Sequence, residues 1–250
     1  MTYSIVARDE KTGEIGIAVA SRFFACGSLV PHVNATAAIA SQAFVNPLWG
    51  TEGLPRLTAG EAPLNVLADF VARDAGQSIR QAHMIAPDGR IAQHTGSDCV
   101  PWCGHVSGPN ISVAGNMLAG PEVVADTLQS YLDHGDLSFE DRLLTAMQSG
   151  EEAGGDKRGK QAAGLLIYAG QPYPDLDLRV DDHADPLSEL RRLQAVSRER
   201  YRMFAMGIAT ADNFSGMTDR TPIDEAIAKD EAYRAANNIS SQSFATPLEA

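Results

Sequence analysis

The chain has 250 residues, 44% of them hydrophobic and 21% charged, which suits one large mixed domain or two small ones. Its formal charge of −12 would repel a nucleic-acid backbone or an anionic lipid surface, so neither is an expected partner. No apolar run approaches the roughly 18–20 residues of a membrane-spanning helix. The N-terminal segment lacks the regions of a signal peptide, and three cysteines are too few for a disulfide framework. We therefore expect a cytoplasmic protein.

The N-terminal residues predict a β-hairpin. The segments TYSIVAR and EIGIAVAS are apolar and rich in β-branched residues, and a short turn-like segment joins them. If Asp9 pairs with Glu14 across that turn, the register places Thr2 opposite Ser21. The same register brings Arg22 close to the start of the chain.

Apolar periodicity and capping residues predict the elements that follow. Strands are expected at 37–45, 113–118 and 162–169, with a second hairpin over 78–95. Helices are expected at 62–73, from Pro121 to His134, from Ser138 to a stop at Gly150, and at 187–204. Residues 206–250 contain few aromatic side chains and are expected to form a partly helical C-terminal extension with a mobile end. We therefore expect a domain over 1–205 and a separate extension over 206–250. Runs of strands followed by runs of helices favour the α+β class.

Thr2 is the first candidate for catalysis. Removal of Met1 before this small residue would leave a threonine with a free α-amine. The reference pKa of such an amine is about 7.7–8.0, so part of it is neutral near pH 7 and able to accept the hydroxyl proton. One residue would then supply both nucleophile and general base. A threonine at position 2 is also common in proteins where it has no such role, and both interpretations stay open on this residue alone.

Five segments resemble, in order, one bacterial and archaeal family of unknown function with an N-terminal-nucleophile (Ntn) hydrolase-like fold. They are TYSIVARD, ASQAFVNPLWG, GNMLAGPEVV, GGDKRGKQAAGLL and DLRVDDHADPLSELRRL, and the resemblance covers roughly residues 2–204. It implies a four-layer α/β/β/α sandwich and says little about the substrate. The best-known threonine enzymes keep a lysine beside the nucleophile, whereas the early hairpin here contains only Lys11, in its turn. Arg22 is a candidate for the electrostatic part of that role, because its charge would lower the pKa of the α-amine, although a guanidinium cannot shuttle a proton. The alternative is that Arg22 is a solvated charge at the end of a strand.

Two further groups of residues are candidates for supporting roles. Asn46 and Asn116 lie where predicted strands end, and their amides are candidates to stabilise an oxyanion; ordinary turn chemistry explains them equally well. Asp156, Arg158 and Gln161 lie in the glycine-rich segment GGDKRGKQ and are candidates for substrate binding, against the alternative of a solvated connection.

The sequence contains no motif that predicts a metal-dependent or cofactor-dependent reaction. His94, Cys99, Cys103 and His105 are zinc-ligand types, but their spacing, H-x4-C-x3-C-x-H, differs from that of the usual zinc sites, so no metal is expected. No phosphate-binding loop, dinucleotide fingerprint, serine-hydrolase elbow or zinc-protease motif is present, and no cofactor is expected.

These observations predict an Ntn-type amidohydrolase acting on a small or peptide-like amide. Thr2 would be the nucleophile, supported by Ser21, Arg22, Asn46 and Asn116. The alternative is an inert Ntn-like scaffold that binds a ligand or a protein partner without cleaving it, because fold does not by itself establish activity. A homodimer is expected, since closed two-fold assemblies are common.

Overall fold

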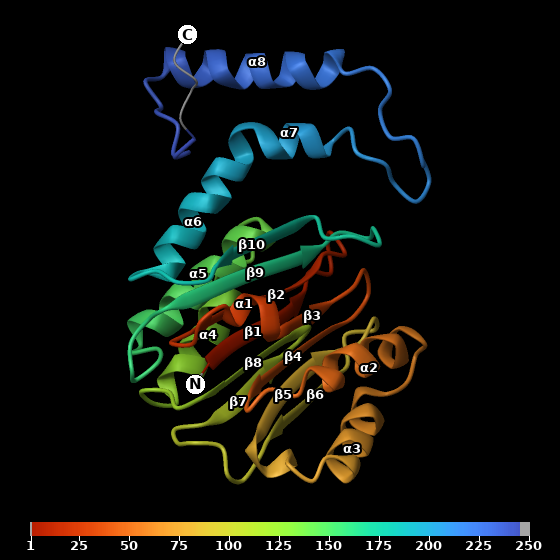
Figure 1. Cartoon of the computed structure of the whole chain (residues 1–250), viewed down its shortest axis with the longest axis vertical. Helices are drawn as coiled ribbons and strands as arrows, with labels where there is room; N and C mark the ends of the chain where they lie inside the picture. Colours follow the sequence, from red (N-terminus) through yellow and green to blue (C-terminus); the bar gives the residue numbers. More distant parts are fainter. Residues whose placement is uncertain (1, 246–250) are drawn as a thin grey trace. The chain divides into compact units, whose positions relative to one another are not determined.

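The computed structural model describes residues 2–245, which form two compact units divided between Leu187 and Ser188 (Figure 1). The boundary predicted between residues 205 and 206 falls inside the second unit and stays a prediction. The predicted removal of Met1 and the last five residues of the predicted mobile end lie outside the described residues. No helix in the described part of the chain is long and apolar enough to cross a membrane.

The first unit is built on two antiparallel sheets, which confirms the α+β class. The larger sheet has six strands in the order β10-β9-β2-β1-β8-β7, and the smaller has four in the order β3-β4-β5-β6. The strands of the larger sheet are β1 (Thr2–Arg8), β2 (Ile15–Ser21), β7 (Gly104–Gly108), β8 (Ile111–Asn116), β9 (Ala162–Tyr168) and β10 (Leu176–Val180). Those of the smaller sheet are β3 (Pro31–Val33), β4 (Ala38–Ala43), β5 (Arg80–Ile85) and β6 (Ile91–Thr95).

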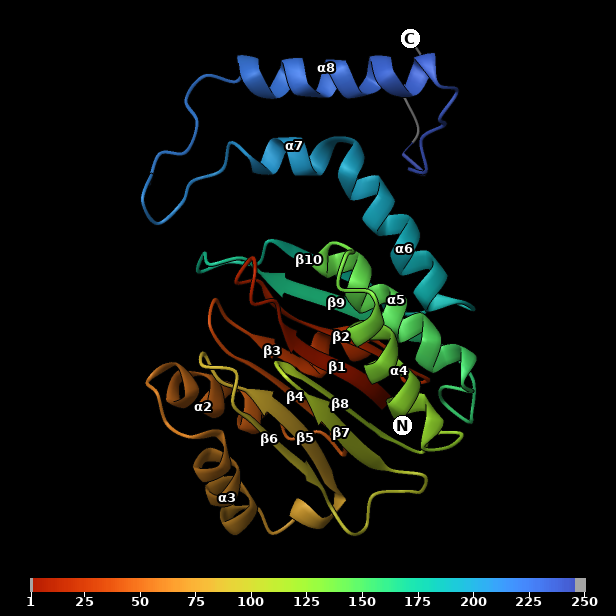
Figure 2. The ribbon, with the colours of Figure 1, turned by 180° about the vertical axis from the view of Figure 1, so that it is seen from behind.

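Helices cover each sheet on the side away from the other sheet. α4 (Glu122–Asp133) and α5 (Phe139–Glu152) pack against the larger sheet, and α2 (Pro47–Thr58) and α3 (Pro63–Arg73) against the smaller one (Figures 1 and 2). The two sheets contact each other mainly through β5 with β8 and β1 with β4. Two short helical turns, α1 (Cys26–Leu29) and η1 (Gln77–Ile79), complete the unit.

The N-terminal hairpin has the predicted register. Tyr3 pairs with Ala20 in the ladder between β1 and β2. The N–H of Asp9 donates to the carbonyl of Glu14 at 2.8 Å, as the predicted turn requires. Because the register continues from these pairs, Thr2 lies opposite Ser21, and the first residue of β1 meets the last residue of β2.

Two differences from the predicted helices involve closely packed glycines. Gly150 does not stop α5, which continues to Glu152. A Cβ at Gly150 would lie 2.2 Å from Thr127 Oγ1, so glycine is present for close packing against α4 rather than for helix termination. The sequence predicts no helix over 47–58, yet α2 forms there. Its Gly50 has the same function, since a Cβ at that position would lie 2.1 Å from the His32 ring.

The second unit is helical in its described part. α6 (Pro186–Val196) begins at the end of the first unit and continues through a π-helical turn, η2 (Ser197–Tyr201), into α7 (Arg202–Ala205). This confirms the helix predicted over 187–204. A loop then leads to α8 (Thr221–Ala236), which buries Ile223 and Ile227.

Candidate functional site

Three neighbouring strands of the larger sheet bring Thr2, Ser21 and Asn116 together at one edge. Thr2 begins β1, Ser21 ends β2 and Asn116 ends β8. Because β2 and β8 both run antiparallel to β1, their last residues flank its first residue. The Thr2 hydroxyl donates to Ser21 Oγ at 3.2 Å, and Thr2 pairs with Asn116 in the ladder. Figure 1 marks the N-terminus at this edge, where the three side chains are 6%, 3% and 3% exposed, respectively.

The amide of Asn116 is directed at Thr2 and at the smaller sheet. Its Nδ2 donates to the Thr2 carbonyl at 3.4 Å and to Gln81 Oε1 at 3.0 Å. An asparagine amide has two hydrogens, and these two bonds use both of them. In this arrangement Asn116 positions the backbone of Thr2, and neither hydrogen is left to donate to an oxyanion.

The loop from Gly154 to Lys160 contacts the residues that follow β8 and β2, beside Thr2. Asp156 forms a β-bridge with Leu118, just beyond Asn116. Its buried carboxylate accepts the N–H of Arg22, just beyond Ser21, at 2.8 Å. The Arg158 guanidinium pairs with the same carboxylate at 3.2 Å and donates to the Arg22 carbonyl at 3.1 Å. The structure therefore brings Arg22, Asp156 and Arg158 together around the Thr2 edge.

The glycines of this loop are required by its backbone. Gly154, Gly155 and Gly159 have φ angles of +112°, +46° and +104°, in the region that residues with a side chain rarely adopt. The glycine-rich composition thus serves a loop of defined shape that holds Asp156 in place. Gln161, at the end of the loop, donates to Asp182 at 3.1 Å. It precedes β9, whose Ala162 pairs with Ser21, so Gln161 lies one strand further from Thr2.

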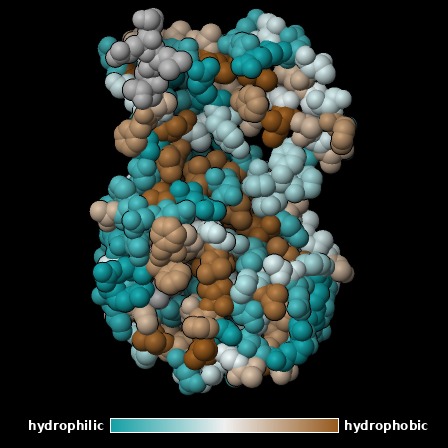
Figure 3. All heavy atoms as spheres, in the orientation of Figure 1, coloured by the Kyte–Doolittle hydropathy of each residue, from teal (hydrophilic) through white to brown (hydrophobic). Residues whose placement is uncertain are grey.

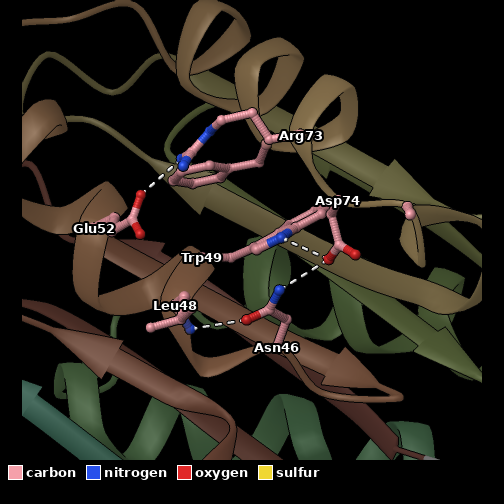
Figure 4. Close-up of a pocket in the computed structure, with 8 residues that line it drawn as sticks. Asn46, Leu48, Trp49, Glu52, Arg73 and Asp74 are labelled. Carbon is pink, nitrogen blue, oxygen red and sulfur yellow. Dashed lines mark hydrogen bonds and ion pairs between the residues drawn. The ribbon is translucent and has the colours of Figure 1, made fainter.

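Asn46 belongs to a different group of residues (Figure 4). It is the N-cap of α2, where its Oδ1 accepts the N–H of Leu48 at 3.1 Å, and its Nδ2 donates to Asp74 at 2.8 Å. Both ends of the side chain are thereby used, and no hydrogen bond between described side chains joins Asn46 to Thr2, Ser21 or Asn116. The structure does not bring this predicted site residue to the others.

Asn46 instead lines a cavity of about 220 Å³ between α2 and the C-terminal end of α3. Asp74 is its central polar group, because its Oδ2 also accepts from Trp49 Nε1 and Arg80 Nε, each at 3.1 Å. Burial alone would raise the pKa of Asp74, but the hydrogen bonds from Asn46, Arg80 and a backbone N–H lower it to about 2. At the cavity rim Arg73 pairs with Glu52 at 2.7 Å, as Figure 4 shows.

A buried polar network between the two sheets was not found by the sequence reasoning. Its members are almost wholly inaccessible to solvent and come from both sheets: Ser4, Gln42, Gln81, His83 and Ser112. Gln42 Nε2 donates to Gln81 Oε1 at 2.9 Å, and Gln81 also accepts from Asn116, so the network reaches the Thr2 edge. The available signal was the alternation of Gln81 and His83 on one strand, which in a half-exposed sheet would indicate the solvent face.

Hydrogen bonds and burial together define the state of His83. Ser4 Oγ donates to Gln42 Oε1 at 2.7 Å, so at 2.8 Å from His83 Nε2 it can only accept from that nitrogen. Burial, together with the positive charge of a protonated His105, lowers the pKa of His83 to about 3, so the ring is neutral near pH 7. Its Nδ1 is then an acceptor, and Ser112 Oγ donates to it at 2.8 Å.

The cysteine and histidine residues considered as zinc ligands do not converge. The thiol of Cys99 donates to the Arg80 carbonyl at 3.2 Å, and that of Cys103 to the Cys99 carbonyl at 3.4 Å. His105 Nδ1 lies 2.9 Å from Thr95 Oγ1, and His94 Nε2 lies 2.9 Å from the Gln77 carbonyl. Across residues 2–245 no group of three or more His, Cys, Asp or Glu side chains has an arrangement that could hold a metal ion.

Comparisons with known proteins identify relatives of unknown function. The model of a family described as a family of unknown function, DUF1028, matches residues 2–190. The chain is similar to the crystal structure of protein SPO2555 from Silicibacter pomeroyi, of the same family, with 30% sequence identity and a TM-score of 0.80. That similarity covers 87% of this chain and 99% of the other. No curated protein matches the chain.

Proposed function

We propose that this chain, which belongs to the DUF1028 family, is an N-terminal-nucleophile hydrolase of a small or peptide-like amide. The observation that carries the proposal is the position of the Thr2 hydroxyl, at the start of a central strand and in contact with Ser21. We further infer that the two facing sheets with helices outside them are the four-layer α/β/β/α sandwich of Ntn hydrolases. The packing of α4 and α5 on one sheet and of α2 and α3 on the other supports this inference.

In the proposed reaction Thr2 supplies both nucleophile and base. Its Oγ1 attacks the carbonyl carbon of the amide while the hydroxyl proton passes to the neutral α-amine. The C–N bond of the substrate then breaks, and the departing amine takes the proton from the α-ammonium. The resulting ester on Thr2 is hydrolysed by water, whose proton passes to the α-amine and then to Oγ1 as the ester C–O bond breaks. The step requires a free α-amine, and therefore the removal of Met1.

The neighbouring residues have supporting roles in this proposal. Ser21 Oγ lies 3.2 Å from Thr2 Oγ1 and holds the hydroxyl in position until its proton passes to the α-amine. Asn116 positions the Thr2 backbone through its bond to the carbonyl. Arg22 places a positive charge beside the chain start and lowers the pKa of the α-amine by repulsion. Asp156 and Arg158 hold the Arg22 backbone in place.

The decisive experiment compares proteins that differ only at the chain start. One protein is released from a cleavable leader with Thr2 as its first residue, and the other retains one residue before Thr2; intact mass verifies both. We expect hydrolysis of a member of a small-amide panel only by the first protein. Thr2→Ala should abolish the activity and Thr2→Ser should keep part of it, because a hydroxyl remains beside the amine.

Thr12→Ala is the matched control, because Thr12 lies in the turn of the same hairpin, at the end opposite Thr2. It should hydrolyse the amide at the wild-type rate. Full activity of the protein with a blocked amine would show that Thr2 is not the catalytic residue. A complete lack of hydrolysis by the Thr2-terminal protein, together with ligand binding, would favour the inert scaffold.

A further inference from the structure

Two exposed cations flank the Thr2 edge, and in the described part of the chain neither has a carboxylate partner. Arg22 follows Ser21 on one side, and Lys157 lies on the other, where its backbone N–H donates to the Met117 carbonyl at 3.4 Å. The Lys157 ammonium donates to the carbonyl of Pro101 at 2.6 Å. Among residues 2–245 neither cation is in an ion pair, whereas Arg158 between them pairs with Asp156.

These two charges are notable because the chain as a whole carries a formal charge of −12. Carboxylates are abundant in the sequence, yet none of those in residues 2–245 forms an ion pair with the two cations that border the proposed nucleophile. A guanidinium and an ammonium on opposite sides of a site attract an anionic group, and the guanidinium can bind a carboxylate through two hydrogen bonds. The local charge therefore selects for an anion at this edge.

Apolar side chains border the same edge. Phe23 and Phe24 directly follow Arg22 and are 55% and 61% exposed, and Val100, next to Pro101, is 44% exposed. Figure 3 shows apolar surface in the first unit around the position where Figure 1 draws α1, the short helix after Phe24. Large apolar side chains that remain exposed beside a polar site provide contact area for an apolar part of a ligand.

We infer that the substrate, given the proposed hydrolase function on which this inference rests, is an amide that carries a carboxylate next to an apolar side chain. N-acylated amino acids and short peptides ending in an apolar residue both have this chemistry. The carboxylate binds between Arg22 and Lys157, and the apolar side chain packs against Phe23 and Phe24. With the carboxylate held there, the amide carbonyl of the ligand lies next to Thr2.

The test measures the binding of three ligands to the Thr2→Ala protein, which is expected not to cleave them. The ligands are N-acetylphenylalanine, its neutral carboxamide and the dipeptide alanylphenylalanine. Calorimetry or NMR titration gives the Kd of each. We expect the two acids to bind about tenfold more tightly than the carboxamide, the change in Kd that one charge-assisted hydrogen bond provides. Arg22→Gln and Lys157→Gln should each remove most of this preference. A difference in Kd between the two acids identifies whether N-acylated amino acids or short peptides are preferred.

Lys11→Gln is the matched control, because Lys11 is also exposed and its ammonium also donates to a backbone carbonyl, at the other end of the β1–β2 hairpin. It should keep the full preference. Equal binding of acid and carboxamide, no binding of any ligand, or an equal loss in Lys11→Gln would overturn the inference. Hydrolysis of the carboxamide at the rate of the acid would do so while leaving the hydrolase proposal in place. Preferential binding of the acid without hydrolysis by the Thr2-terminal protein would contradict the hydrolase proposal alone.

Discussion

Two polar clusters of the first unit contain an asparagine near the end of a strand, but the clusters differ in burial and in what they hold. Asn116 lies between the sheets and directs its amide at Thr2 and Gln81. Asn46 lies at the outer side of the smaller sheet, where it caps α2 and donates to Asp74 beside a surface cavity. The first cluster is joined to the proposed nucleophile, and the second joins two helices.

The comparison shows that an asparagine near the end of a strand can belong either to a functional site or to a helix cap. An asparagine at a helix N-cap contributes about 1 kcal/mol to stability and needs only the backbone N–H two residues later. An asparagine buried between sheets needs partners from other strands for both of its amide hydrogens, because an unpaired buried donor costs about 1–3 kcal/mol. Gln81 and the Thr2 carbonyl meet that need for Asn116.

Within the two clusters, the largest expected effect on activity comes from Asn116→Ala. This change removes the bond that positions the Thr2 backbone and leaves the rest of the strand ladder in place. A shift of the nucleophile by about 1 Å is expected to lower kcat about 100-fold. The measurement is steady-state hydrolysis of the amide found with the Thr2-terminal protein, and an unchanged kcat would remove Asn116 from the site.

A second effect, on stability rather than on activity, is expected from the pH dependence of the buried cluster. Folding lowers the pKa of His83 from 6.5 to about 3, so between these values the unfolded chain binds the additional proton. The free energy of unfolding therefore falls as the pH drops below 6.5, by up to about 1.4 kcal/mol per pH unit from this group.

Urea unfolding of the wild type and of His83→Gln between pH 7 and pH 4 measures this contribution. The glutamine retains hydrogen-bonding groups but does not titrate. The advantage of the wild type should shrink as the pH falls, because only its histidine is penalised for remaining neutral. A difference that stays constant across this range would show that His83 does not titrate on unfolding as expected.

The smallest effect is expected from Asn46→Ala, in the outer cluster. Loss of the N-cap and of the bond to Asp74 should lower the free energy of unfolding by about 1 kcal/mol. Hydrolysis should stay at the wild-type rate, since the structure joins Asn46 to the helices and not to Thr2. Thermal unfolding and the amide assay, run beside Asn116→Ala, measure both. A loss of activity comparable to that of Asn116→Ala would mean that the two clusters are coupled.

Sequence patterns predicted correctly those elements that depend on residues close together in the chain. The turn from Asp9 to Glu14 determines the hairpin register, and with it the meeting of Thr2 and Ser21. The Ser138 cap and the apolar spacing after it were sufficient to place the start of α5. Gly150 was misleading as a helix stop, because its function is close packing against Thr127, which lies on another helix.

The sequence by itself therefore determined the hairpin, the class of fold, and the placement of a threonine and an arginine near the chain start. Only the tertiary structure decided which asparagine accompanies Thr2, because that depends on β8 lying beside β1 and on Gln81 facing it from the other sheet. It also decided that Ser4, Gln42 and His83 are buried. A strand pattern places such residues on one face, but whether that face meets water or a second sheet depends on strands far away in the chain.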